Sequence, residues 1–208
     1  AVIPRDGGGV RLEGAHGSQV SGAVVMTAGA WTSAVAGALV ELPELVVTQE
    51  QPAHFPFLLR DGAVLPDGAA ELPGFNHSPD PHESADAYFR SDVYGMWTPG
   101  EGIKAGWHGT GPVTDPDART YRAEPDQLTD LQRYAREWLP GARWQEPEPI
   151  SCTYTSTANT DFILDRVGDL VIGAGFPGHG YKFAPAIGEV LANLALAVGQ
   201  RPASIFAL

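Results

Sequence analysis

The sequence of 208 residues contains a single cysteine, Cys152, which rules out an internal disulfide framework. Basic residues are also scarce: 13 Lys and Arg stand against 25 Asp and Glu, and the net charge of -12 argues against nucleic acid or an anionic membrane as a partner. No apolar run approaches the roughly 20 residues that a membrane-spanning helix needs, and the first segment does not resemble a signal peptide. We therefore expect a globular, cytoplasmic protein of one or two domains.

Hydrophobic periodicity predicts two helices and six strands. One helix is expected over 185–198, with Gly199 as its stop, and another from the N-cap Asp126 to Pro140-Gly141. The predicted strands are Val24–Thr27, Leu45–Gln49, His54–Leu59, Gly102–His108, Ser151–Ser156 and Asp169–Ile172. The stretch 66–92 reads as a long loop with short strands. The order is a strand–helix opening, a strand-rich middle that ends in a helix, and a strand–helix close.

The glycine-rich run 173–183 is the most informative motif. Gly173, Gly175 and Gly178 fit the G-x-G-x-x-G dinucleotide fingerprint between a predicted strand and a predicted helix. A complete unit then needs a second parallel strand with an acidic residue about 20 positions on, and no Asp or Glu follows Glu189. This favours glycines that bring backbone close to a ligand at a helix N-terminus, where N–H groups and the helix dipole favour negative charge. A free-standing Rossmann-type nucleotide binder is the alternative.

Two strands carry side chains that could act together. Alternation puts Lys104, Gly106 and His108 on one face of their strand, with room over the glycine for something flat. The alternative is a solvent-facing polar stripe on an ordinary antiparallel sheet. Cys152 and Tyr154 share a face in the same way, and the cysteine is either inert packing or a reactive thiol.

Four segments taken together resemble a known family. They are Val24-Val25-Met26 with Ala28-Gly29-Ala30-Trp31-Thr32-Ser33, Gly102 to His108, Cys152-Thr153-Tyr154-Thr155, and Gly173 to Phe183. In this order they are similar to the signatures of the sarcosine oxidase and N-methyl amino acid oxidase group, flavoproteins with the fold of D-amino-acid oxidase. The resemblance implies an α+β fold, in which the C-terminal part of an FAD-binding Rossmann-like domain (1–40 and 149–208) flanks an antiparallel-sheet substrate domain (41–148).

The resemblance also implies roles for individual residues. Cys152 would bind FAD covalently as a thioether, Lys104 would activate oxygen beside the flavin, and Lys182 would pair with the substrate carboxylate. His108 would lie in the active site and Tyr94 would line the substrate pocket. The implied cofactor-binding residues are Cys152, Ala28, Gly29, Trp31, Gly175, Gly178, His179, Gly180 and Lys182, and no metal is expected. Backbone of Gly178, His179 and Gly180 would contact the flavin pyrimidine oxygens.

Two features of the family do not occur in this sequence: an N-terminal strand–GxGxxG–helix and an arginine that helps to bind the substrate carboxylate. We therefore expect the chain to be the C-terminal portion of an oxidase that an N-terminal FAD-binding chain or fragment completes. The implied reaction transfers hydride from an amine or N-methyl amino acid to FAD and electrons to O2, which gives H2O2. A non-catalytic binding or assembly subunit with the same fold is the alternative.

Overall fold

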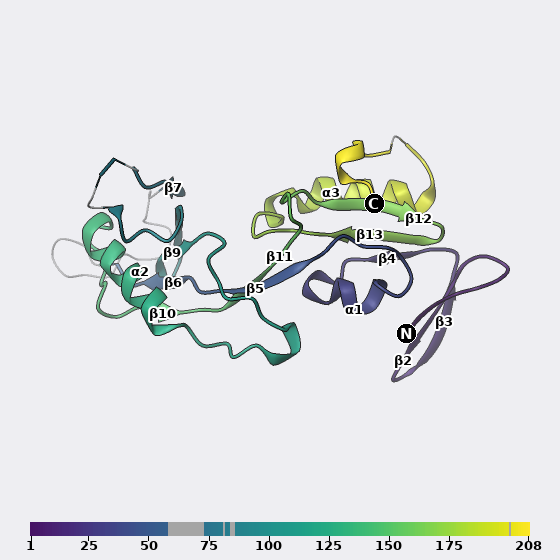
Figure 1. Ribbon diagram of the computed structural model, residues 1–208, viewed down its shortest axis with the longest axis horizontal. Coiled ribbons are helices and arrows are strands. Elements are labelled where there is room, and N and C mark those ends of the chain that lie inside the picture. The colour runs from purple at the N-terminus through teal and green to yellow at the C-terminus, as the bar shows by residue number, and fades with distance from the viewer. Residues whose placement is uncertain (58–72, 81, 84–85, 200) are drawn as a thin grey trace. The chain divides into compact units, whose positions relative to one another are not determined.

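The computed structural model describes residues 1–57, 73–80, 82–83, 86–199 and 201–208 (Figure 1). The chain forms two compact units, Ala1–Val47 with Tyr154–Leu208 and, between these segments, Thr48–Thr153. It leaves the first unit within β5 (Val46–Glu50) and returns within β11 (Cys152–Ser156), and these two strands pair with each other. The first unit is thus built from two segments that are distant in sequence.

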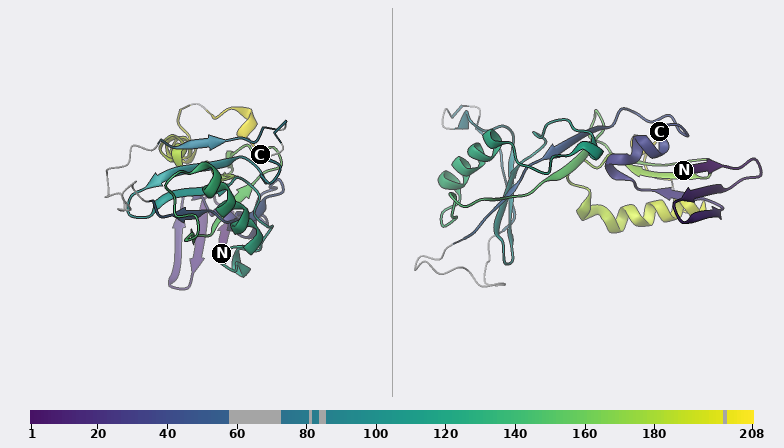
Figure 2. Two further views of the ribbon diagram at one scale, coloured as in Figure 1. Left: turned by 90° about the vertical axis from the view of Figure 1, so that its left-hand side faces the viewer. Right: turned by 90° about the horizontal axis from the view of Figure 1, so that it is seen from below.

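The first unit contains a three-stranded sheet in the order β12-β13-β4. These strands are Ile163–Val167, Leu170–Ala174 and Val24–Met26. β13 runs antiparallel to β12 and parallel to β4. Helix α3 (Ala184–Leu196) lies along β12 and β13 (Figures 1 and 2), where Leu191 and Leu194 pack against Leu164 and Val171. One face of the sheet is therefore covered by α3.

The opposite face of this sheet packs against N-terminal residues. Ile163, Ile172 and Ala174 form a cluster with Val10 and with Ala36 of the short helix α1 (Thr32–Ala36). Burial on both faces explains why β13 reads as a continuous apolar run. The N-terminal segment itself forms an antiparallel sheet of β1 (Val2–Pro4), β2 (Val10–Gly14) and β3 (Gly17–Ser21), which the sequence patterns did not predict.

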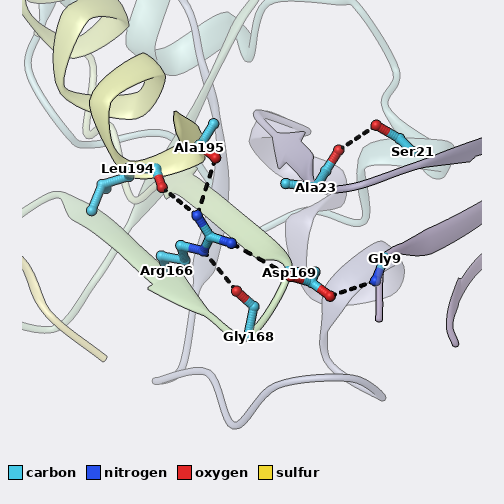
Figure 3. A network of polar contacts seen from close by, with 8 residues as sticks. All are labelled: Gly9, Ser21, Ala23, Arg166, Gly168, Asp169, Leu194 and Ala195. Atoms are coloured by element: carbon cyan, nitrogen blue, oxygen red, sulfur yellow. Dashed lines mark hydrogen bonds and ion pairs between the residues drawn. The ribbon is translucent and has the colours of Figure 1, made fainter. Parts of the chain in front are cut away.

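A polar network closes the C-terminal end of α3 (Figure 3). Nη1 of Arg166 donates to the carbonyl oxygens of Leu194, at 2.8 Å, and Ala195, at 3.1 Å. Nη2 of Arg166 lies 3.4 Å from Oδ1 of Asp169, whose Oδ2 accepts a bond of 2.6 Å from the backbone N–H of Gly9. The last carbonyl groups of a helix lack partners in its regular ladder, and Arg166 binds two of them; that of Leu194 also accepts from the backbone N–H of Ala197 at 3.2 Å.

The second unit is built on an antiparallel sheet in the order β10-β6-β9-β8-β7. In that order the strands are Glu148–Pro149, Ala53–Phe55, Gly102–Trp107, Val93–Thr98 and Phe75–His77. Helix α2 (Pro125–Trp138) covers one face, with Leu131 and Tyr134 at the centre of its contact. Ile103, Ala105 and Trp107 belong to this core, so the predicted alternation along the strand is confirmed.

Two predicted boundaries are wrong in detail. The N-cap of α2 is Glu124 and not Asp126, because Pro125 occupies the first helical position, where its missing N–H costs nothing. The strand expected over 54–59 ends at Phe55, and residues 58–59 lie outside the described part of the chain. Strands β8 and β12 were not predicted from their residue patterns. The mixture of helices and sheets confirms the α+β class.

Candidate functional site

Three predicted site residues lie together on the face of the second unit's sheet that points away from α2. Tyr94 pairs with Gly106 across β8 and β9, and Lys104 and His108 flank that glycine in the sequence. A Cβ atom on Gly106 would lie 2.8 Å from Oη of Tyr94, so the tyrosine ring occupies the space over the glycine. The rings of Tyr94 and His108 are 6.4 Å apart at 84°. The flat group beside Gly106 in this structure is therefore Tyr94.

A fourth side chain on this face, His54, has no counterpart among the predicted residues. The register of β6 and β9 places His54 directly opposite Lys104. Nothing in the linear sequence marks this histidine, because the two residues are 50 positions apart and meet only through strand pairing.

Cys152 begins strand β11 and is a free, half-buried cysteine. The residue before it is held in place: Nη2 of Arg119 donates to both the carbonyl oxygen and Oγ of Ser151, at 3.1 and 3.0 Å. Partial exposure distinguishes this thiol from an inert core cysteine and is a condition for reaction with a ligand.

The remaining predicted residues gather at one edge of the sheet in the first unit. Because β4 and β13 are parallel, with Met26 opposite Ile172, the segments that follow them leave the sheet at the same edge. These segments carry Ala28, Gly29, Trp31, Gly175, Gly178, His179, Gly180 and Lys182. The carboxyl edge of parallel strands is the usual place for ligands in such sheets.

Close packing explains several of the glycines. Gly178 has φ +80°, and a Cβ atom there would lie 2.0 Å from Cζ of Tyr154. A Cβ atom on Gly173 would lie 2.8 Å from Leu191, which shows that this glycine lets α3 approach β13. His179 is held locally, with Nδ1 at 3.1 Å from the carbonyl oxygen of Pro177. The shape of the loop is therefore set by its own packing and hydrogen bonds.

A mostly apolar groove of about 520 Å³ lies between this loop and α3. It is lined by Thr27, Phe176, Gly178, Gly180, Tyr181, Ala184, Ile187, Gly188 and Leu191. The N-cap of α3, Phe183, makes no side-chain capping bond, and the first turn contains no acidic residue. Lys182 is exposed in the turn just before the helix. A glycine-edged groove beside an uncapped helix N-terminus suits a flat ring with electronegative atoms, so these residues fit a flavin.

In the described part of the chain we find no candidate metal site, no membrane-spanning helix and no second strand of a dinucleotide-binding unit. No group of three His, Cys, Asp or Glu side chains within it could hold a metal ion. Over the same residues, every helix is too short or too polar to cross a membrane. The described residues after α3 form a single 3-10 turn, Ser204–Phe206, and not the second parallel strand of a dinucleotide-binding unit.

Comparison with known proteins shows the family of the chain. The model of the DAO family, described as FAD dependent oxidoreductase, matches residues 1–194. The chain belongs to this family. The family assignment confirms the resemblance that the four sequence motifs carry.

Among curated relatives of the family, monomeric sarcosine oxidase from a Bacillus species is 31% identical over 192 residues, which are 89% of this chain and 46% of that protein. N-methyl-L-tryptophan oxidase from Salmonella agona is 30% identical over 213 residues, covering 96% of this chain and 50% of that protein. The chain therefore spans about half the length of these relatives.

Solved structures show the same fold. NikD, an unusual amino acid oxidase essential for nikkomycin biosynthesis, superposes with a TM-score of 0.75 at 22% identity, over 99% of this chain and 52% of that one. Iminodiacetate oxidase from Chelativorans superposes with a TM-score of 0.71 at 18% identity, over 100% of this chain and 51% of that one.

Proposed function

We propose that this chain is the C-terminal portion of an FAD-dependent oxidase that acts on an amine or an N-methyl amino acid. The observation that carries the proposal is that Tyr94, Lys104 and His108 share one face of a sheet whose other face packs against α2. The two curated relatives named above, which are oxidases of sarcosine and of N-methyl-L-tryptophan, support the substrate class.

When bound, FAD supplies the redox chemistry: it accepts a hydride from the carbon next to the substrate amine and passes the electrons to O2, which leaves as H2O2. Lys104 would stand beside the cofactor as a fixed cation. Its ammonium group would stabilise superoxide as the first electron reaches oxygen. Tyr94 would line the substrate pocket, and His108 would contact the substrate from the same face.

The glycine-rich loop would serve the cofactor and the substrate. Backbone N–H groups of Gly178, His179 and Gly180 lie near the start of α3, whose dipole would favour negative charge at the flavin pyrimidine oxygens. Lys182 would pair with the substrate carboxylate. Ala28, Gly29, Trp31 and Gly175 would line the cofactor at the same sheet edge.

Cys152 would anchor the cofactor covalently through a thioether to the 8-methyl group. The S–C bond would replace one S–H bond and one C–H bond, and O2 would take up both hydrogens with their electrons as H2O2. The thiolate is the nucleophile that this bond requires.

The other half of the relatives' length would supply the strand–GxGxxG–helix for the ADP part of FAD and an arginine for the substrate carboxylate. This half would lie in the same polypeptide or in a partner chain.

The experiment that tests the function uses the complete purified protein with any chain that co-purifies. We expect a flavin spectrum, bleaching by sarcosine or another N-methyl amino acid without oxygen, and stoichiometric H2O2 when air is admitted. A protein that binds FAD but is bleached by no amine would contradict the oxidase and favour the assembly subunit. Oxidation without oxygen consumption would point to another electron acceptor.

A further inference from the structure

A buried histidine and a glutamate lie beside Lys104. His54 is only 5% exposed, and its Nδ1 lies 2.8 Å from Oε2 of Glu101, whose side chain is 57% exposed. Glu101 belongs to the turn between β8 and β9, where its backbone N–H bonds to the carbonyl oxygen of Thr98. The pair therefore joins this turn to strand β6.

Strand register extends this pair into a row of charges. His54 is directly opposite Lys104 on β9 and opposite Glu148 on β10, and Met96 of β8 stands on the far side of Lys104. Residues opposite one another in an antiparallel sheet point to the same face, with Cβ atoms roughly 5 Å apart. Lys104, Glu101 and Glu148 are thus the charged groups that face His54 among the described residues.

The charge state of His54 follows from these neighbours. Burial lowers the pKa of His54 below its usual 6.5; Glu101 and Glu148 oppose this effect, and Lys104 reinforces it. At pH 7 the ring is therefore neutral, and its Nδ1 lies within 2.8 Å of the Glu101 carboxylate without making a hydrogen bond to it.

We propose that His54 and Glu101 form a positioning pair that keeps the Glu101 carboxylate away from the ammonium group of Lys104. The inference rests on the proposed role of Lys104 as the cation that promotes reaction with oxygen. Glu101 is three residues from Lys104, yet among the described residues its carboxylate lies against Nδ1 of His54 and forms no ion pair with Lys104. An ion pair would neutralise Lys104 and draw its flexible side chain out of place.

The kinetic test separates the two half-reactions in the complete FAD-loaded protein. We expect His54→Leu to slow reoxidation of the reduced flavin by O2 about tenfold, while its reduction by substrate changes less than about twofold. The double variant His54→Leu/Glu101→Gln should recover most of the oxygen rate, because the competing carboxylate is gone. The matched control His54→Leu/Glu148→Gln should stay slow.

A second test does not depend on activity or on the His54→Leu variant. In complete protein labelled with 13C-histidine, the signal of His54 is assigned by its loss in His54→Gln, and its pKa is followed by NMR titration. We expect Glu101→Gln to lower this pKa, since it removes a negative charge beside the ring. We expect Lys104→Met to raise it, since it removes a positive charge. This readout also survives if His54→Leu fails to fold.

The outcomes distinguish this inference from the proposed function. If Lys104→Met is reoxidised as fast as the parent protein, Lys104 has no role with oxygen and the inference falls with it. If O2 reoxidises the flavin slowly in Lys104→Met but at the parent rate in His54→Leu, the inference alone is overturned. The same holds if His54→Leu/Glu101→Gln recovers none of the reoxidation rate. An unchanged pKa of His54 in both Glu101→Gln and Lys104→Met likewise overturns it.

Discussion

At the scale of residues, the two faces of strand β9 in the second unit have different neighbours. Ile103, Ala105 and Trp107 pack under α2, whereas Lys104 and His108 point to the other face with Tyr94. Apolar neighbours fully explain the first set. The second set lies on the face to which the proposed function assigns chemistry.

We expect Lys104→Met to slow reoxidation of the flavin by about 10²- to 10³-fold, with a much smaller effect on its reduction by substrate, because the cation acts on charge that develops only in the oxygen step. Stopped-flow mixing of reduced protein with several concentrations of O2 measures the rate. Lys104→Arg keeps the positive charge and should retain more activity. Equal slowing of both half-reactions would contradict the assignment.

Cys152→Ser should yield protein whose flavin is released by acid precipitation, whereas the parent protein should stay yellow in the pellet. The reason is that a hydroxyl group cannot replace the thiolate as the attacking nucleophile. Peptide mapping of the parent protein by flavin absorbance and mass should find the cofactor on the fragment that contains Cys152. An unmodified thiol in active protein would refute the covalent link.

At the scale of elements, α3 and the strands beneath it form the platform of the candidate cofactor site. The helix is held at its C-terminal end by Arg166 and approaches β13 where Gly173 lies against Leu191. Its N-terminal turn carries the groove and follows the glycine-rich loop. Stability of this platform should therefore affect cofactor retention.

Arg166→Met should lower the free energy of unfolding by about 1–2 kcal/mol, since it removes charge-assisted bonds to the α3 carbonyl groups from a side chain that is 22% exposed. Urea unfolding followed by circular dichroism measures the change. Arg201→Met is the matched control: this side chain is 75% exposed and lies 3.8 Å from Asp165, so its loss should cost less than about 0.5 kcal/mol. Equal effects would contradict the role of Arg166.

Gly178→Ala should destabilise the loop by about 2 kcal/mol or more and weaken FAD retention, because φ is +80° and the new methyl group would overlap the Tyr154 ring. Gly22→Ala provides the comparison, as a Cβ atom there meets nothing within 4 Å. Thermal unfolding and FAD content of both variants report the result. A Gly178→Ala protein as stable as Gly22→Ala would show that the ring moves aside freely.

At the scale of the whole molecule, the chain corresponds to about half of the relatives it matches. Within the described residues, β4 is the outer strand of its sheet, and the groove beside α3 is apolar. Both features suit further contacts from the part of the relatives' length that this chain does not span.

We expect a protein limited to residues 1–208 to bind FAD at least about tenfold more weakly than the complete protein, because the contacts to the ADP part would be missing. Fluorescence titration with FAD measures both affinities. Size-exclusion chromatography with mass determination shows which chains the active particle contains. A particle made only of this chain that holds FAD and oxidises an amine would contradict this expectation.

Local patterns in the sequence determined the helices over 125–138 and 184–196, the two-faced strand Gly102–Trp107 and the family. These features depend on periods of 3.6 and 2 residues and on short motifs, which a linear sequence records. The N-terminal sheet was not predicted from the sequence, because its strand Gly17–Ser21 is almost wholly exposed and lacks an alternation of apolar and polar residues.

Only the tertiary structure decided which distant residues meet. It placed His54 opposite Lys104, the Tyr154 ring against Gly178, and the segments after β4 and β13 at one sheet edge. Strand register and close packing set these contacts, and both depend on the long-range pairing of segments rather than on the order of neighbouring residues.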